Sequence, residues 1–173
     1  GKQIEPLYSV EEIAKTVDRV AGEIAAVPAK DLLVISVLKG SFVFAADLIR
    51  ALHHAGLAPE VEFISLSSYG AGTEPGEIRV LRDVESEVAG RTVLLIDDIL
   101  ESGRTVKFAR ALMLSRGAAE VPIAVLLDKP MRRKADIEAD YVGFSCPDQF
   151  VVGYGMDVGH AFRELPFVGR VVD

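Results

Sequence analysis

The chain has 173 residues, half of them hydrophobic and 26% charged, with 19 lysines and arginines against 26 aspartates and glutamates. Its length suits one domain with a substantial core, and its composition excludes a wholly disordered chain. The net charge of −7 argues against a protein that binds nucleic acid or an anionic membrane surface. The net charge does not exclude the binding of a small anionic substrate by backbone amides in a local pocket.

The cysteine content and the hydropathy pattern indicate the cellular compartment of the protein. The single cysteine, Cys146, cannot form an internal disulfide, which favours a reducing compartment. No apolar run approaches the roughly 18 residues of a membrane span, and the first residues of the sequence have no signal-peptide core. We therefore predict a cytoplasmic location and no membrane partner.

The apolar pattern predicts the order of helices and strands. A helix is predicted to open the chain, because Ser9 and Glu12 have the spacing of a capping box and apolar residues then recur at threes and fours. Short apolar runs predict strands, several of them buried on both faces. The predicted strands cover residues 32–37, 61–67, 78–81, 92–96, 121–127, 141–144 and 168–172, and the later helices cover 41–54 and 105–116.

This order of elements predicts a fold class. Strands that alternate with helices favour an α/β fold, with a mainly parallel twisted sheet flanked by helices on both faces. The strand at 78–81 has no helix before it, so part of the sheet is predicted to be antiparallel. No linker is long enough to separate two full domains.

The strongest candidate site follows the strand at 92–96. In open α/β sheets, ligands bind beyond the carboxyl ends of the strands. Here a buried strand runs into Asp97 and Asp98, and then a turn containing Gly103 leads into a helix, whose free amides suit a phosphate. The two aspartates suit sugar hydroxyls or hydrated Mg²⁺, although a strand end with solvated acids and a hydroxyl cap would have the same pattern.

Residues 93–105 resemble the phosphoribosyl-pyrophosphate (PRPP) signature of type I phosphoribosyltransferases: an apolar strand, two acids, two apolar residues, an acid, a hydroxyl residue, Gly and Thr. Four further blocks resemble the hypoxanthine-guanine phosphoribosyltransferases and fall in order along residues 32 to 170. They are residues 38–42, 67–70, 127–130 and 150–157. The resemblance implies one domain over residues 1–173, with a core of about residues 30–145 and a small hood from about 1–28 and 146–173.

The resemblance also implies a reaction in purine salvage. A 6-oxopurine base, hypoxanthine or guanine, displaces pyrophosphate from PRPP and yields IMP or GMP, with Mg²⁺ as the required cofactor. The family further implies a homodimer or a homotetramer. The order of preference among hypoxanthine, guanine and xanthine stays open.

For PRPP, the resemblance implies a pyrophosphate loop at residues 38–40, where the family often has a cis peptide bond. Glu101 replaces the family's usual aspartate as the catalytic acid or base, and stabilisation of positive charge on the sugar is the alternative role. The implied metal ligands are Asp157, Asp97 and Asp98. The implied PRPP-binding residues are Lys39, Gly40, Asp97, Asp98, Glu101, Ser102, Gly103, Arg104, Thr105 and Arg163.

For the purine, the resemblance places the Lys129 ammonium on the exocyclic oxygen. A lysine has donors and no acceptor, so it favours the keto oxygen of hypoxanthine or guanine over the amino group of adenine. Phe150 is implied to stack on the base, and the Val151 backbone to meet its edge. Ser68 and Tyr69 are implied to form the root of a mobile lid over residues 70–76.

Some features depart from this pattern or allow another interpretation. Residues 158–161 differ from the family's usual aromatic-Asn-Glu pattern, and His160 is a candidate substitute partner there. The basic run at 131–134 predicts a solvated loop or a subunit contact, with a phosphate contact as the alternative. A catalytically weak RNA-binding regulator is the second functional hypothesis, which the negative net charge disfavours. Transferases for adenine, orotate or uracil are disfavoured by the Lys129 block.

Overall fold

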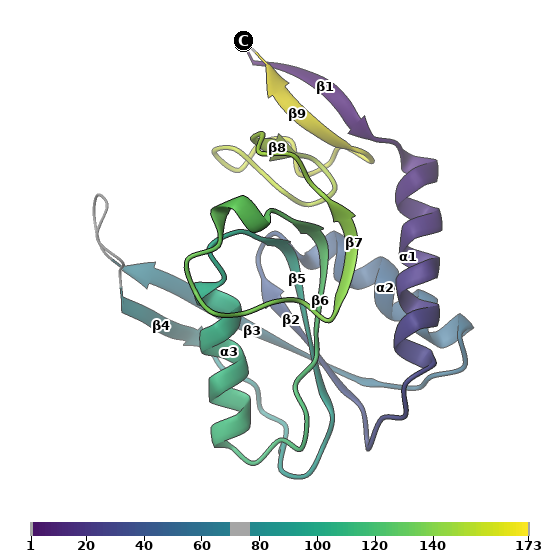
Figure 1. Ribbon diagram of the computed structural model, residues 1–173, viewed down its shortest axis with the longest axis vertical. Helices are drawn as coiled ribbons and strands as arrows, with labels where there is room; N and C mark the ends of the chain where they lie inside the picture. Colours follow the sequence, from purple (N-terminus) through teal and green to yellow (C-terminus); the bar gives the residue numbers. More distant parts are fainter. Residues whose placement is uncertain (1, 70–76, 173) are drawn as a thin grey trace.

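The computed structural model describes residues 2–69 and 77–172, and its centre is a six-stranded twisted sheet (Figure 1). The strand order is β4-β3-β2-β5-β6-β7, with β4 antiparallel to β3 and the other neighbours parallel. The strands are β2 (Leu33–Leu38), β3 (Glu60–Tyr69), β4 (Glu77–Arg82), β5 (Val93–Leu100), β6 (Ile123–Asp128) and β7 (Tyr141–Ser145).

Helices cover both faces of this sheet because its central strands are apolar on both sides. Helices α1 (Val10–Ala25) and α2 (Phe42–His54) pack on one face, with the inward residues Leu94 and Ile96 of β5. Helix α3 (Arg104–Ser115) packs on the other face, with Leu95 and its neighbours. The predicted α/β sheet with helices on both faces is therefore confirmed, as is the antiparallel part.

A second, small antiparallel sheet lies at the carboxyl ends of β5, β6 and β7 (Figure 1). Its order is β1-β9-β8, and its strands are β1 (Gln3–Tyr8), β9 (Val168–Val172) and β8 (Val151–Val152). The ring of Tyr8 stacks on Phe144 of β7 with centroids 4.0 Å apart, which anchors the small sheet on the large one.

The prediction that a helix opens the chain was wrong, because β1 comes before α1. Strand β1 shows no clear apolar alternation and forms by pairing with β9, which lies at the other end of the chain. The capping box itself is confirmed: Ser9 Oγ accepts from the Glu12 amide at 3.1 Å, and Glu12 Oε1 accepts from the Ser9 amide at 3.0 Å. Strand β8 and a short 3₁₀ turn (Pro130–Arg132) were also absent from the predicted elements.

Helix α1 contacts α2 and β7, so residues 10–25 cover the large sheet, whereas the small sheet is made from residues 3–8, 151–152 and 168–172. The division of the chain into a core and a hood stays a prediction. Within residues 2–69 and 77–172, no helix combines the length and apolar character needed to cross a membrane.

Candidate active site

Two adjoining cavities open at the carboxyl ends of the central strands. The first, of about 330 Å³, is lined by the loop after β2, the end of β5 and the turn before α3. The second, of about 210 Å³, lies between the end of β5, Lys129 and residues 150–157. Both linings include Gly40, Asp98 and Glu101, so one extended ligand can span the two cavities.

The turn between β5 and α3 brings backbone to the first cavity. Gly103 caps the helix with a φ of +85°, in the left-handed region, and a Cβ there would lie 2.5 Å from Ile137 Cγ2. Ser102, Gly103 and Thr105 line the cavity. Because the first amides of a helix have no acceptor within it, this turn offers donors to an anion. Arg104 is exposed and lies outside the lining of both cavities.

Two adjacent carboxylates, Asp97 and Asp98, line the first cavity. Asp97 Oδ1 accepts from the Asp98 amide at 2.8 Å, and Asp98 Oδ1 accepts from the Ile99 amide at 2.7 Å. Burial raises the pKa of both carboxyl groups, and the charge of Asp98 raises the pKa of Asp97 further. A cation or hydroxyl donors would stabilise both carboxylates.

The loop after β2 packs tightly against these acids. The peptide bond between Leu38 and Lys39 is cis, as the resemblance implies. A Cβ at Gly40 would overlap the Asp98 carboxylate, and a Cβ at Gly155 would lie 2.8 Å from the Gly40 carbonyl oxygen. Glycine at both positions therefore allows the loop to lie between Asp98 and the segment that leads to Asp157. Lys39 is exposed and lines the first cavity.

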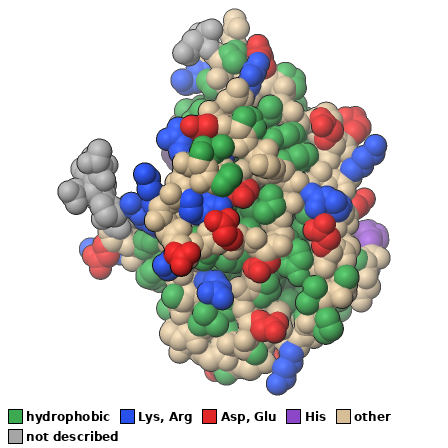
Figure 2. Space-filling view, in the orientation of Figure 1, with side chains coloured by type: hydrophobic (Ala, Val, Ile, Leu, Met, Phe, Trp, Pro, Cys, Tyr) green, Lys and Arg blue, Asp and Glu red, His purple; other side chains and the backbone are tan. Residues whose placement is uncertain are grey.

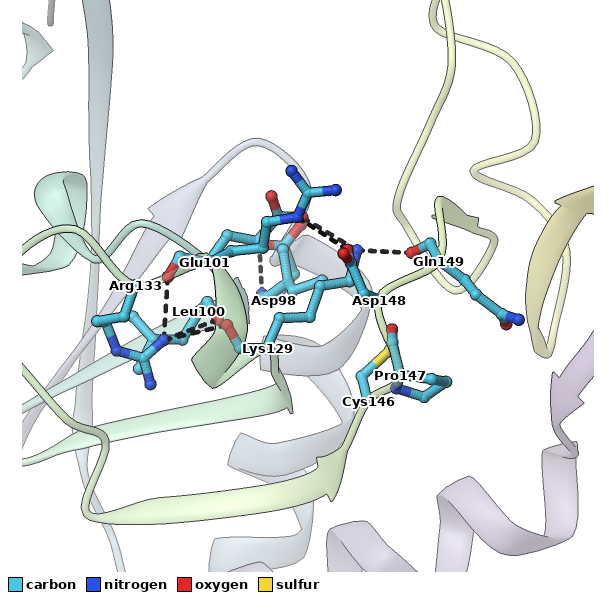
Figure 3. A network of polar contacts seen from close by, with 11 residues as sticks. Asp98, Leu100, Glu101, Lys129, Arg133, Cys146, Pro147, Asp148 and Gln149 are labelled. Atoms are coloured by element: carbon cyan, nitrogen blue, oxygen red, sulfur yellow. Dashed lines mark hydrogen bonds and ion pairs between the residues drawn. The ribbon is translucent and has the colours of Figure 1, made fainter.

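Lys129 stands in the wall of the second cavity, where its side chain is almost fully buried. Its Nζ donates to the Gln149 carbonyl oxygen at 2.6 Å and lies 3.4 Å from Glu101 Oε1 (Figure 3). An ammonium group has three donors, so one stays available for an acceptor in the cavity. Phe150 and Val151 line the same cavity; Phe150 is 57% exposed, which leaves its ring accessible to a planar ligand.

Asp157 lines the second cavity and is held by residues of its own loop. Its Oδ2 accepts from the His160 amide at 2.8 Å and lies 3.3 Å from Arg163 Nη2. Arg163 also donates to the Gly155 carbonyl at 2.6 Å, and it lies outside the lining of both cavities. The structure thus pairs Arg163 with the predicted metal ligand, and its contact with pyrophosphate stays a prediction. The His160 imidazole is exposed and its Nδ1 lies 3.9 Å from Asp157 Oδ2, so the hydrogen bond to Asp157 comes from the His160 backbone amide.

The acidic residues fit a magnesium ion that arrives with a phosphorylated substrate. In the described part of the chain, no three His, Cys, Asp or Glu side chains gather as a preformed metal centre. Asp97 and Asp98 line the first cavity, and Asp98 and Asp157 line the second. Mg²⁺ usually takes one or two carboxylates and keeps several waters or substrate oxygens, so an incomplete protein ligand set suits it.

Of the predicted lid, the structure describes only the root, at Ser68 and Tyr69. The backbone of Ser68 and Tyr69 ends β3 and pairs with Ile78 and Glu77 of β4. Residues 70–76 lie outside the described residues, so the lid stays a prediction.

Sequence reasoning missed one arginine beside the site whose side chain is largely covered. Within the run at 131–134, predicted as a solvated loop or a subunit contact, the Arg133 side chain is only 10% exposed and bonds the Glu101 carbonyl oxygen. The prediction of a solvated side chain was wrong for Arg133, and a subunit contact of this run stays a prediction. Its partners Leu100 and Glu101 lie about thirty residues away in the chain, and its nearer partners Asp128, Ile137 and Glu138 are brought to it only by the fold of the loop, so the sequence does not distinguish it from the exposed Arg132.

Comparison with known proteins agrees with this geometry. The model of the phosphoribosyl transferase domain matches residues 3–158, and the chain belongs to that family. Similar proteins include the hypoxanthine-guanine phosphoribosyltransferase of Bacillus subtilis, 44% identical over 94% of this chain and 90% of that protein. The hypoxanthine phosphoribosyltransferase of Escherichia coli K12 is 38% identical over 82% of this chain and 79% of that protein.

Solved structures give the same assignment. A hypoxanthine-guanine phosphoribosyltransferase from Bacillus anthracis matches with a TM-score of 0.90 and 39% identity, covering 99% of this chain and all of that one. The Trypanosoma cruzi hypoxanthine phosphoribosyltransferase in complex with the product IMP matches with a TM-score of 0.89 and 36% identity, covering 98% and 94%. The predicted fold and the predicted purine-salvage phosphoribosyltransferase of the hypoxanthine-guanine group are confirmed.

Proposed function

We propose that the two adjoining cavities bind the two substrates of the transfer reaction, PRPP in the first and a 6-oxopurine in the second. The observation that carries this proposal is the Lys129 ammonium, buried in the wall of the second cavity with one donor available and with Glu101 at 3.4 Å. A buried donor at this point favours a keto oxygen and disfavours an amino group.

In the PRPP half, each group of the substrate meets a matching part of the protein. The amides and hydroxyls of residues 102–105 bind the 5′-phosphate, and Arg104 adds positive charge at the surface. Asp97 and Asp98 accept hydrogen bonds from the ribose hydroxyls, which suits two acids whose charged forms are disfavoured in the free protein. Lys39, the backbone at Gly40 and Arg163 bind the pyrophosphate.

Magnesium belongs to the PRPP half. Asp157 would hold it together with Asp97 and Asp98, directly or through water. When bound, the ion neutralises the charge that develops on the leaving pyrophosphate. Arg163, 3.3 Å from Asp157 in the free protein, orients that carboxylate.

In the purine half, Lys129 donates to the exocyclic oxygen, Phe150 stacks on the base and the Val151 backbone meets its edge. A bond forms between a purine ring nitrogen and the ribose carbon, while the bond from that carbon to pyrophosphate breaks. The proton of that nitrogen passes to the Glu101 carboxylate, which borders both cavities. The alternative is that Glu101 only stabilises the positive charge on the sugar ring.

We further propose a homodimer or homotetramer in the cytoplasm, with no nucleic-acid or membrane partner. A Trypanosoma cruzi relative, 36% identical, has been studied for the role of its C-terminal region in its oligomeric state. A single buried thiol at Cys146 suits a reducing compartment. On the face that Figure 2 shows, the lysines and arginines of the described residues lie among acidic side chains instead of forming a broad basic surface.

The test supplies PRPP and Mg²⁺ with hypoxanthine, guanine, xanthine or adenine and follows formation of the monophosphate. We expect turnover of the 6-oxopurines and little of adenine. In Lys129→Met, we expect kcat/KM for hypoxanthine to fall by about 10³-fold, because the buried donor is lost. The control is Lys30→Met, an exposed lysine at the amino end of the sheet. Faster turnover of adenine than of hypoxanthine by the wild-type protein would overturn the role of Lys129.

A further inference from the structure

Arg133 lies in the loop after β6 and holds the backbone at the end of β5 (Figure 3). Its Nη1 donates to the carbonyl oxygen of Glu101 at 3.0 Å and to that of Leu100 at 3.3 Å. Its Nε donates to the Ile137 carbonyl oxygen at 2.9 Å. One planar guanidinium therefore joins the start of the turn that lines the first cavity to the loop behind that turn.

Two carboxylates compensate the buried charge of Arg133. Its Nη2 lies 2.7 Å from Asp128 Oδ1, at the end of β6, and 2.9 Å from Glu138 Oε2. Burial on its own lowers the pKa of Arg133, and the hydrogen bonds to Glu138 and Asp128 raise it, so the guanidinium stays charged. Because Asp128 directly precedes Lys129, the same arginine connects the turn to the strand end that carries the purine-facing lysine.

The loop holds the rest of the turn as well. The Ser102 carbonyl oxygen accepts from the amides of Lys134 and Ala135, both at 2.9 Å. A Cβ at Gly103 would lie 3.2 Å from Arg133 Cδ, so the arginine stem packs against the helix cap. With these carbonyl oxygens bonded to the loop, the amides that follow remain for the cavity that Ser102 and Gly103 line.

We infer that Arg133 is a positioning residue for PRPP, which holds the turn between β5 and α3 in the conformation that receives the 5′-phosphate. The inference rests on the proposed binding of PRPP in the first cavity. Arg133 lies outside the lining of both cavities and acts through the backbone of Leu100 and Glu101. Phosphate binding by preorganised amides depends on such support, since a loose turn must be ordered at the expense of binding energy.

The chain contains a matched arginine far from the cavities. Arg91, just before β5, has a side chain that is 11% exposed and donates to the carbonyl oxygens of Asp31 at 2.9 Å and Glu87 at 3.3 Å. It also pairs with the carboxylate of Glu60 at 3.0 Å. Burial and partners are thus similar at the opposite end of the sheet, so Arg91→Met measures the cost of losing such an arginine for stability alone.

The experiment compares Arg133→Met, Arg133→Lys and Arg91→Met by Tm, kcat and the KM values for PRPP and hypoxanthine. Methionine keeps an apolar stem against Gly103 and removes every donor. We expect Arg133→Met to raise KM for PRPP by about tenfold or more while KM for hypoxanthine changes by less than about twofold. Lysine should not restore the KM, because one ammonium group cannot replace the planar fork. Arg91→Met should lower Tm and leave both KM values unchanged.

A KM for PRPP within twofold of wild type in Arg133→Met, with a loss of Tm like that of Arg91→Met, would make Arg133 a purely structural residue. If Arg133→Met does not fold, Arg133→Lys decides alone, and a wild-type KM for PRPP in that variant overturns the inference. In both of these outcomes the wild-type protein still forms IMP from PRPP and hypoxanthine. Failure of the proposed function is distinct, because the wild-type protein would then form no IMP from PRPP and hypoxanthine, and the inference would fall with it.

Discussion

Carboxylates near the two ends of the central sheet have opposite electrostatic environments. Near the amino ends, Glu62 Oε2 accepts from the Ser86 hydroxyl and amide, both at 2.7 Å, and from the Glu85 amide at 2.9 Å. The bond from the Ser86 side chain is the main reason that the pKa of Glu62 is lowered. At the carboxyl ends, burial raises the pKa of Asp97 and of Asp98.

Of the two ends of the sheet, only the amino end is complete without a ligand. Near the amino ends, the folded protein itself supplies the donors that a carboxylate needs. At the carboxyl ends, acids stand together in a cavity, at a cost in stability that a bound substrate can offset. The arginines follow the same division, since Arg91 joins loops remote from the cavities and Arg133 supports the turn that lines one.

The largest effect among substitutions that test this division is expected at Glu101. In Glu101→Gln the side chain keeps its shape and loses its ability to take a proton, so we expect kcat to fall by about 10²-fold or more. Steady-state kinetics across pH measures this. Glu60→Gln, at an exposed carboxylate of the amino end, is the matched control and should change kcat by less than about twofold. Unchanged turnover of Glu101→Gln at every pH would remove this residue from the mechanism.

A second substitution should separate stability from activity. The pKa of Asp97 is raised in the folded protein, so its negative charge opposes folding. Below the unfolded pKa of 3.8 the carboxyl group is neutral and costs no stability, and the free energy of unfolding falls as pH rises through the higher folded pKa. Asp97→Asn removes this loss and can still accept from the Asp98 amide. We expect its free energy of unfolding at pH 7 to rise by about 1 to 2 kcal/mol while turnover falls.

Denaturant unfolding at pH 7 and at pH 3, without added divalent ions, checks the sign. The stabilisation of Asp97→Asn should shrink at pH 3, where the wild-type carboxyl group is protonated in both states. Equal or lower stability at pH 7 would contradict the view that the two acids are held at a cost.

The smallest effect is expected at Glu62, with the opposite sign. Its lowered pKa contributes stability that is present above the unfolded value of 4.5 and is lost as pH falls through the folded pKa. Glu62→Gln should therefore destabilise the protein at pH 7 by less than about 1 kcal/mol. The variant should also lose less stability than the wild type as pH falls. Thermal unfolding between pH 3 and pH 7 measures it, with turnover at pH 7 unchanged. A stabilised Glu62→Gln would remove the contrast between the two ends.

Much of this protein was predictable because the signals are local. Apolar runs of five to eight residues indicate strands buried on both faces, and β2, β5 and β6 appear within one or two residues of their predicted positions, apart from the carboxyl end of β5. The capping box at Ser9 and Glu12 acts over one helical turn, so its geometry follows from its spacing. The signature at residues 93–105 is also contiguous, which is why the sequence alone determined the family and the class of reaction.

The tertiary structure decided what depends on contacts between distant segments. Strand β1 requires β9 as its partner, and Arg133 has its role because Leu100 and Glu101 fold back beside it. Likewise, the Lys129 ammonium meets Glu101 across 28 residues of chain. Packing and hydrogen bonding between such groups depend on how the whole sheet folds, and neither periodicity nor composition carries that information.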